Sequence, residues 1–249
     1  MIYICVPAHN EERTAGVLLW KIRQVMADFP RDYQILVMDD ASTDHTAEVL
    51  APYARVLPLT IARSATRRGY AASVEALLRE SVQRSRYPKR DVAVTLQADF
   101  TDEPGDIPAL VKRLEAGADI VSGRPRINGA APRPVRWGRR LLGRVLRRVA
   151  GVAADPLSGF RAYRLITLKR AFESNGRPLL KLDGWAANAE LLRAVAPHAR
   201  RIDEVDVETR YTRRVRPSRF RLWDTAFQLL RLRRTPVQAP GAVPPLFES

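Results

Sequence analysis

The chain opens with residues 2–11, IYICVPAHNE, a short apolar run that ends in a polar cluster. Consecutive apolar residues up to Val6 are typical of a strand that is buried on both faces. Pro7 ends the run, and polar residues that include His9 and Glu11 follow it. The pattern predicts a parallel strand whose carboxyl end carries functional side chains.

The same pattern repeats outward from this strand through the first half of the chain. Strands are predicted at 35–38, 55–61, 92–96 and 119–122, and helices at 10–28, 43–50, 69–84 and 106–116. This alternation favours an α/β fold, with a mostly parallel sheet that is flanked by helices on both faces. Ligands bind such sheets beyond the carboxyl ends of the strands.

Acidic residues close two of these strands. Asp39 and Asp40 follow the second strand, and Asp99 follows the fourth, close to Gln97. We expect them to share one rim with the cluster after Val6. Paired carboxylates can bind a ribose or base, or cap the next helix. Asp99 can ligate Mg²⁺ or Mn²⁺, or lie in an exposed turn. The glycine motifs of dinucleotide and P-loop folds are missing from the sequence.

The second half of the chain does not continue the alternation. Helices are predicted at 164–174 and 185–196, a loop and short strand from 155, and a strand at 201–211. Arginine-rich amphipathic helices are predicted at 134–150 and 218–233. We expect a catalytic domain over 1–212, a basic acceptor-facing or membrane-facing segment over 213–234, and an irregular proline-rich tail over 235–249.

The composition is strongly basic. In 249 residues, 42 Lys and Arg against 27 Asp and Glu give a net charge of +15. Two explanations for this excess stay open: an arginine-rich genome, or attraction to phosphate groups in nucleic acid, anionic lipid or a charged substrate. One cysteine excludes a disulfide framework, and the lack of a signal peptide or of a long apolar run favours a cytoplasmic protein, peripheral on the inner face of the membrane.

Four motifs in order carry a family resemblance: VPAHNE at 6–11, DDASTDHT at 39–46, QADFTDEP at 97–104 and DPLSGFR at 155–161. Together they resemble glycosyltransferase family 2, and within it the dolichol- or polyprenol-phosphate mannosyltransferases. The resemblance implies a GT-A fold, a nucleotide-sugar donor such as GDP-mannose, Mg²⁺ or Mn²⁺ as cofactor, a polyprenyl-phosphate acceptor, and inversion at the sugar carbon.

The resemblance also implies site residues. Those that would bind the nucleotide are Pro7, His9, Glu11, Val37, Asp39 and Asp40. Those that would hold the metal are Asp99, Gln97 and Thr101. Gln97 departs from the family, which has an aspartate there, so the site offers a neutral carbonyl oxygen and one charge fewer.

For the acceptor phosphate, the implied residues are Arg124, Arg139, Arg140, Arg213, Ser218 and Arg219. Arg219 replaces a lysine of the family pattern, and a guanidinium fork suits phosphate oxygens. Asp99 and Arg124 are the implied catalytic residues. Because a phosphate monoester loses its second proton at about pH 6, it can attack without a catalytic base. If the acceptor is a hydroxyl group, Asp155 is the candidate base.

Several readings remain open at this stage. One alternative is an enzyme of the same fold that uses a UDP-sugar or a non-lipid acceptor, and another is an inactive scaffold, prompted by Gln97. A nucleic-acid-binding protein would explain the basic charge but not the acidic rim, so we expect no nucleic-acid partner. The basic helices either contact the membrane surface or pack on the sheet, and a separate membrane-anchoring protein is a possible partner.

Overall fold

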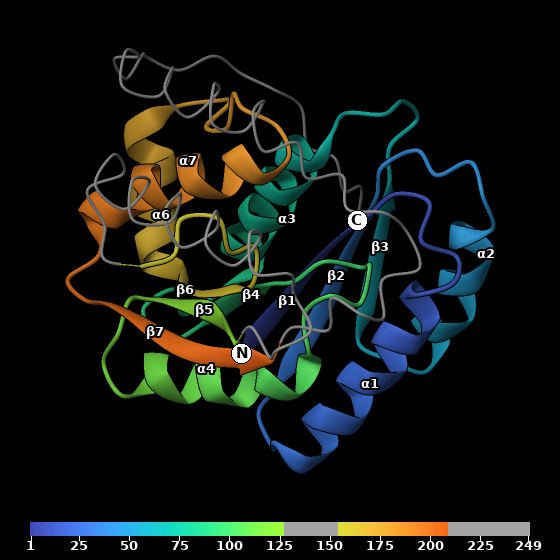
Figure 1. Cartoon of the computed structure of the whole chain (residues 1–249), viewed down its shortest axis with the longest axis horizontal. Coiled ribbons are helices and arrows are strands. Elements are labelled where there is room, and N and C mark those ends of the chain that lie inside the picture. The colour runs from blue at the N-terminus through green and yellow to red at the C-terminus, as the bar shows by residue number, and fades with distance from the viewer. Residues whose placement is uncertain (127–153, 209–249) are drawn as a thin grey trace, which may run out of the picture.

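A computed structural model describes residues 1–126 and 154–208 of the chain (Figure 1). The strands are β1 (Ile2–Ala8), β2 (Tyr33–Asp39), β3 (Leu59–Arg63), β4 (Val92–Thr95), β5 (Ile120–Arg126), β6 (Arg161–Arg164) and β7 (Ile202–Glu208). The helices are α1 (Ala15–Asp28), α2 (Thr46–Leu50), α3 (Tyr70–Arg84), α4 (Ile107–Glu115), α6 (Leu165–Asn175) and α7 (Trp185–Val195). Short 3₁₀ helices occupy Ala51–Arg55, Pro104–Asp106 and Ala196–His198.

The strands form one sheet in the order β3-β2-β1-β4-β6-β5-β7. β1 pairs in parallel with both β2 and β4, and β2 pairs in parallel with β3. β6 is antiparallel to its neighbours β4 and β5, whereas β5 and β7 are parallel. The carboxyl ends of β1, β2 and β4 therefore lie at one edge of the sheet, which confirms the predicted mostly parallel α/β architecture.

Helices cover both faces of the sheet, with α1 and α4 on one face and α3, α6 and α7 on the other (Figure 1). The strand β1 shows why, because its alternate side chains enter two separate cores. Ile4 packs with Leu18 and Ile22 of α1 in the first core, whereas Cys5 packs with Leu77 of α3 in the second. The prediction of a strand buried on both faces is confirmed.

Several predicted elements differ in their bounds, and two of them show the physical reason. The helix predicted from residue 10 begins at Ala15, because residues 9–14 form a loop that is bonded to the segment after β2. The strand predicted at 55–61 is β3, at Leu59–Arg63, because the 3₁₀ helix Ala51–Arg55, with Pro52 in its first turn, occupies the residues before it. The strand predicted at 201–211 is β7, and the short strand predicted after the 155–161 loop is β6.

Some predictions fall on residues that the structure does not describe. These are the basic helices at 134–150 and 218–233, the segment 213–234 and the tail 235–249. Across 1–126 and 154–208, no helix combines the length and the apolar character needed to cross a bilayer.

Candidate active site

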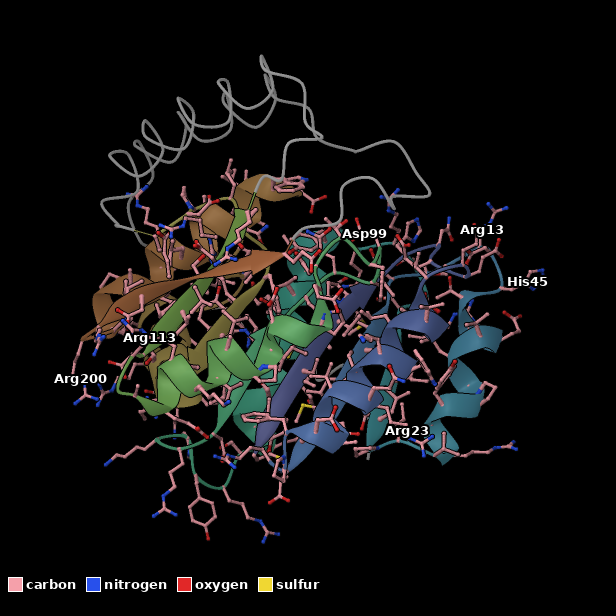
Figure 2. The ribbon with its side chains drawn as sticks, turned by 60° about the horizontal axis from the view of Figure 1, so that its bottom comes forward. Arg13, Arg23, His45, Asp99, Arg113 and Arg200 are labelled. Atoms are coloured by element: carbon pink, nitrogen blue, oxygen red, sulfur yellow. The ribbon has the colours of Figure 1, made fainter. Side chains whose placement is uncertain are left out.

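A cavity of about 360 Å³ opens at the edge where β1, β2 and β4 end. Its walls come from segments far apart in the chain: residues 7–14 after β1, Asp40 after β2, the start of α3, residues 97–99 after β4, and the start of α7. Figure 2 shows Asp99 and Arg13 at the same end of the molecule, with Arg23 of α1 near the other end. The predicted common rim therefore exists.

The loop after β1 and the loop after β2 are bonded side by side. Three backbone N–H groups of the first loop donate to the second: Asn10 to Ser42 Oγ at 2.9 Å, Glu11 to Thr46 Oγ1 at 2.7 Å, and Glu12 to Asp44 Oδ2 at 3.3 Å. One hydrogen bond runs in the opposite direction: the N–H of Thr43 in the second loop donates to Asn10 Oδ1 in the first at 2.7 Å. These bonds fix the loop that precedes α1, and residues of that loop line the cavity.

Asp39 and Asp40 have different environments although they are adjacent. Asp39 is fully buried; its Oδ1 accepts from the N–H of Ser42 at 3.0 Å, and its Oδ2 lies 3.3 Å from Arg63 Nε. Val37 is buried in the core on the α1 face. Neither Asp39 nor Val37 lines the cavity, whereas Asp40 does. Of the nucleotide residues implied by the resemblance, the cavity brings together Pro7, His9, Glu11 and Asp40.

The carboxylate of Asp40 binds the backbone that leads into α3. Its Oδ1 accepts from the N–H of Arg68 at 2.7 Å, and its Oδ2 accepts from the N–H of Gly69 at 2.9 Å. The Asp40 carbonyl oxygen lies 2.8 Å from His9 Nδ1. A buried carboxylate at the amino end of a helix is stabilised by the N–H groups there. Asp40 therefore connects the first loop with the loop that carries Arg67.

The edge at β4 carries the candidate metal ligands. Asp99 lines the cavity together with Gln97, and Asp99 Oδ1 accepts from the N–H of Thr101 at 3.0 Å. The backbone N–H of Gln97 donates to Asp102 Oδ2 at 3.3 Å. Thr101 is buried and does not line the cavity. One carboxylate and one amide oxygen fit a divalent cation that takes its other ligands from phosphate and water. Within 1–126 and 154–208, no three His, Cys, Asp or Glu side chains cluster as a metal site.

The cavity floor is close-packed around Gly159. A Cβ at this position would lie 3.1 Å from Gln97 Nε2, 3.1 Å from Tyr70 Oη and 3.3 Å from Asn188 Nδ2, so only glycine fits without a shift. The Tyr70 hydroxyl donates to Asn188 Oδ1 at 2.9 Å. Burial, followed by the charge of Asp102, raises the pKa of Tyr70 above its ordinary value.

A buried arginine ties the floor together. Arg161 is 1% exposed, and its guanidinium donates to the carbonyl oxygens of Asn188 at 2.5 Å and Asp155 at 2.7 Å, and to Ser122 Oγ at 3.3 Å. None of the described carboxylates forms an ion pair with it. The Asp155 carboxylate accepts from the N–H of Leu157 at 3.0 Å and does not line the cavity.

Arg124 lies outside the cavity, on β5. Its Nη2 is 2.6 Å from Asp206 Oδ1 and its Nη1 is 3.6 Å from Glu204 Oε2, both on β7. The hydrogen bond and charge of Asp206 raise the pKa of Arg124. The remaining acceptor residues of the resemblance lie outside the described residues: Arg139, Arg140, Arg213, Ser218 and Arg219.

The structure adds cavity residues that sequence analysis missed. Arg13 and Arg67 line the cavity, and neither forms an ion pair with another described residue. Asp183, Trp185 and Asn188 line it from the start of α7. The available sequence signals were Arg13 in the loop after β1, Arg67 ahead of α3, and the Asp-Gly-Trp sequence ahead of a predicted helix. Arginines are frequent throughout this chain, so none of these signals stood out.

A mostly parallel sheet of this topology, with a carboxylate, an amide and guanidinium groups around one cavity where its strands end, is the arrangement expected of a GT-A glycosyltransferase. The sequence comparison is more specific. A family model described as "Glycosyl transferase family 2" matches residues 3–175, and the chain belongs to that family.

Relatives of known function cover only part of the chain. An undecaprenyl-phosphate 4-deoxy-4-formamido-L-arabinose transferase of Pseudomonas paraeruginosa is 31% identical over 165 residues, which are 66% of this chain and 47% of that protein. The enzyme of the same name from Pseudomonas fluorescens Pf-5 is 30% identical over 164 residues, with the same coverage. The chain thus spans about half the length of these relatives.

Solved structures share the fold. Glucosyl-3-phosphoglycerate synthase from Mycobacterium tuberculosis superposes with a TM-score of 0.64 at 21% identity, covering 94% of this chain and 80% of that chain. The same enzyme in complex with Mn²⁺, UDP-glucose and phosphoglyceric acid gives a TM-score of 0.62 at 22% identity, covering 94% of this chain and 78% of that one.

Proposed function

We propose that this chain transfers a sugar from a nucleotide-sugar to a polyprenyl phosphate at a membrane surface, with inversion at the anomeric carbon. One observation carries the proposal: the Asp99 carboxylate lines the same cavity as the guanidinium groups of Arg13 and Arg67, which form no ion pair with any residue in 1–126 or 154–208. That combination suits a diphosphate, because a bridging cation and arginines both neutralise phosphate oxygens.

The donor would enter with its nucleoside against the loop after β1, where Pro7, His9 and Glu11 line the cavity. Asp40 would act through the backbone it binds, by fixing the loop that carries Arg67. Asp99 and the Gln97 amide oxygen would hold Mg²⁺ or Mn²⁺, which supplies positive charge to the diphosphate when it is bound. Asp39, buried beneath this rim, would support the second loop through Ser42.

The reaction needs no proton transfer at the acceptor. An acceptor phosphate oxygen forms the new bond to the anomeric carbon on the face opposite the diphosphate, and the bond from that carbon to the diphosphate oxygen breaks. A phosphate monoester is mostly a dianion at neutral pH, so it attacks directly. The residues of this chain contribute alignment and charge neutralisation. For the acceptor phosphate we retain Arg124, Arg139, Arg140, Arg213, Ser218 and Arg219 as candidates.

The relatives support the acceptor class, since their names specify undecaprenyl phosphate as the acceptor and a formamido-arabinose as the sugar. The motif resemblance favours GDP-mannose as donor instead. A donor panel separates the two. Purified protein is incubated with short-chain polyprenyl phosphate and a set of GDP- and UDP-sugars, with Mn²⁺ or with EDTA, and the glycolipid product is measured. We expect one of these donors to support turnover in the presence of Mn²⁺, and we expect EDTA to abolish that turnover.

The matched variants are Asp99→Ala and Asp28→Ala, the latter at the exposed end of α1 away from the cavity. Asp99→Ala should abolish turnover while Asp28→Ala leaves it unchanged. Turnover in Asp99→Ala at the unaltered rate would remove the metal assignment. If the sugar were transferred to a hydroxyl acceptor and not to polyprenyl phosphate, the proposed lipid acceptor would be wrong. The alternative, an enzyme of the same fold with a non-lipid acceptor, would then hold.

A further inference from the structure

One wall of the cavity comes from a part of the chain that the family model does not cover. That model ends at residue 175, whereas Asp183, Trp185 and Asn188 line the cavity from the start of α7. α7 lies on the face of the sheet that carries α3 and α6, and the loop after β1 approaches from the face that carries α1 (Figure 1). The cavity thus has a wall common to the family and a second wall outside the matched region.

Asp183 is held in place by one oxygen and offers the other. Its Oδ1 accepts from the N–H of Ala71 in the first turn of α3 at 3.1 Å, and no described residue donates to Oδ2. A Cβ on Gly69 would lie 2.9 Å from this Oδ2, so a larger residue there would collide with the carboxylate. Glycine also suits the φ of +92° at this position. Asp183 is exposed and lines the cavity, so Oδ2 can accept a hydrogen bond from a ligand.

Trp185 supplies an aromatic surface next to this carboxylate. Gly184 has a φ of +60°, a conformation that favours glycine, and the chain turns there into α7. The Trp185 ring packs against the small cluster of Leu157, Ala186 and Ala189 and also lines the cavity. A half-buried ring and an accepting carboxylate at one wall match a sugar, which has an apolar C–H face and hydroxyl groups at its edge.

We propose that Asp183 and Trp185 form the subsite that selects the transferred sugar: Asp183 accepts from ring hydroxyl groups, and Trp185 stacks on the sugar face. The inference rests on the proposed function, because it takes the cavity to be the donor site. Asn188 belongs to the support of this wall, since its amide oxygen is taken by Tyr70. The nucleoside diphosphate part of the donor contacts the other wall and does not depend on this subsite.

The test compares two ligands in each variant of the full-length chain. Calorimetry with Mn²⁺ measures Kd for the bare nucleoside diphosphate, GDP or UDP, and for the nucleotide-sugar that is the best substrate in the donor panel. Asp183→Asn keeps an oxygen for the Ala71 N–H but loses the second carboxylate oxygen. We expect it to weaken nucleotide-sugar binding by about tenfold or more, because sites built to bind a hydroxyl discriminate strongly, while diphosphate binding stays within about twofold.

Trp185→Ala should show the same split, Trp185→Phe a smaller one, and Asp28→Asn none. A donor that lacks the contacted hydroxyl should bind the wild type and Asp183→Asn equally. Equal weakening of both ligands, or unchanged binding of both, would overturn the proposal. So would a variant that binds the donor normally but has a raised KM only for the acceptor. Failure of every nucleotide to bind the wild type would instead refute the proposed function.

Discussion

Replacing Asp40 with alanine should lower the stability of the protein as well as its activity. Asp40 is 4% exposed, and its two oxygens accept from the N–H groups of Arg68 and Gly69 at 2.7 and 2.9 Å. Hydrogen bonds to a charged group contribute about 1.5–3 kcal/mol each, so two of them set a range of about 3–6 kcal/mol. Water in the cavity can reach the freed N–H groups, and we therefore expect the lower end, about 3 kcal/mol.

For a chain of this size, a loss of about 3 kcal/mol corresponds to a fall in Tm of about 6–12 °C. Thermal unfolding followed by circular dichroism measures it, with Asp28→Ala as the exposed aspartate control. Asp40→Asn is the second variant, because its amide nitrogen faces an N–H donor and cannot accept from it. We expect a loss between those of the control and of Asp40→Ala.

The two roles of Asp40 predict different results. If its carboxylate clamps the backbone before α3, both variants lose stability without any ligand present. If it served only as a nucleotide ligand, the Tm of the ligand-free protein would stay within about 2 °C of the wild type, and donor affinity alone would fall. That second result would refute the clamp.

Three further predictions follow from the floor, the metal edge and a distant ion pair. Gln97→Asp adds a carboxylate beside Asp99 and should lower the Mn²⁺ concentration for half-maximal activity several-fold; an unchanged metal titration would contradict this. Gly159→Ala places a methyl group 3.1 Å from Gln97 Nε2 and Tyr70 Oη, so we expect a loss of about 1 kcal/mol in urea unfolding and weaker donor binding, and unaltered values would argue against a close-packed floor. Burial alone would raise the pKa of Asp119, but hydrogen bonds from the Arg200 backbone and guanidinium, with the charge of Arg164, hold it below its ordinary value. Its stabilising contribution is therefore complete above the unfolded pKa of about 3.9 and is lost as the pH falls through the lower folded value, so the stability gap between wild type and Asp119→Asn should narrow at pH 3; a constant gap would contradict the ion pairs.

The residues of the rim could be predicted from the sequence, because in a parallel sheet they follow directly after each apolar strand. Each apolar run that ends in polar residues places those residues at the same edge, whatever the exact strand order. The two neighbours Asp39 and Asp40 show the limit of that reasoning. Side chains alternate along a strand, so Asp39 shares the α1 face with Val37 and is buried there. Asp40 follows the strand and turns to α3. Sequence adjacency does not reveal this divergence.

The wall at α7 could not be predicted for a different reason. Asp183 and Trp185 reach the cavity only because β6 enters the sheet beside β4 and Arg161 ties the floor to the Asn188 carbonyl oxygen. Both are contacts between residues far apart in the chain, and no local sequence pattern within residues 183–188 predicts them. Local patterns did predict α7 itself, whose bounds of Trp185–Val195 lie within one residue of the expected helix.

The antiparallel strand β6 also sets an order of events while the chain is being synthesised. Until residues 161–164 emerge, the edge of β4 that later pairs with β6 has no partner, and open edges invite pairing with other chains. At about 5–20 residues per second, the ribosome needs roughly 5–20 seconds to proceed from Asp99 to Asn188. During that interval the nascent protein has its first loops but neither floor nor second wall, which makes it a candidate client for chaperones.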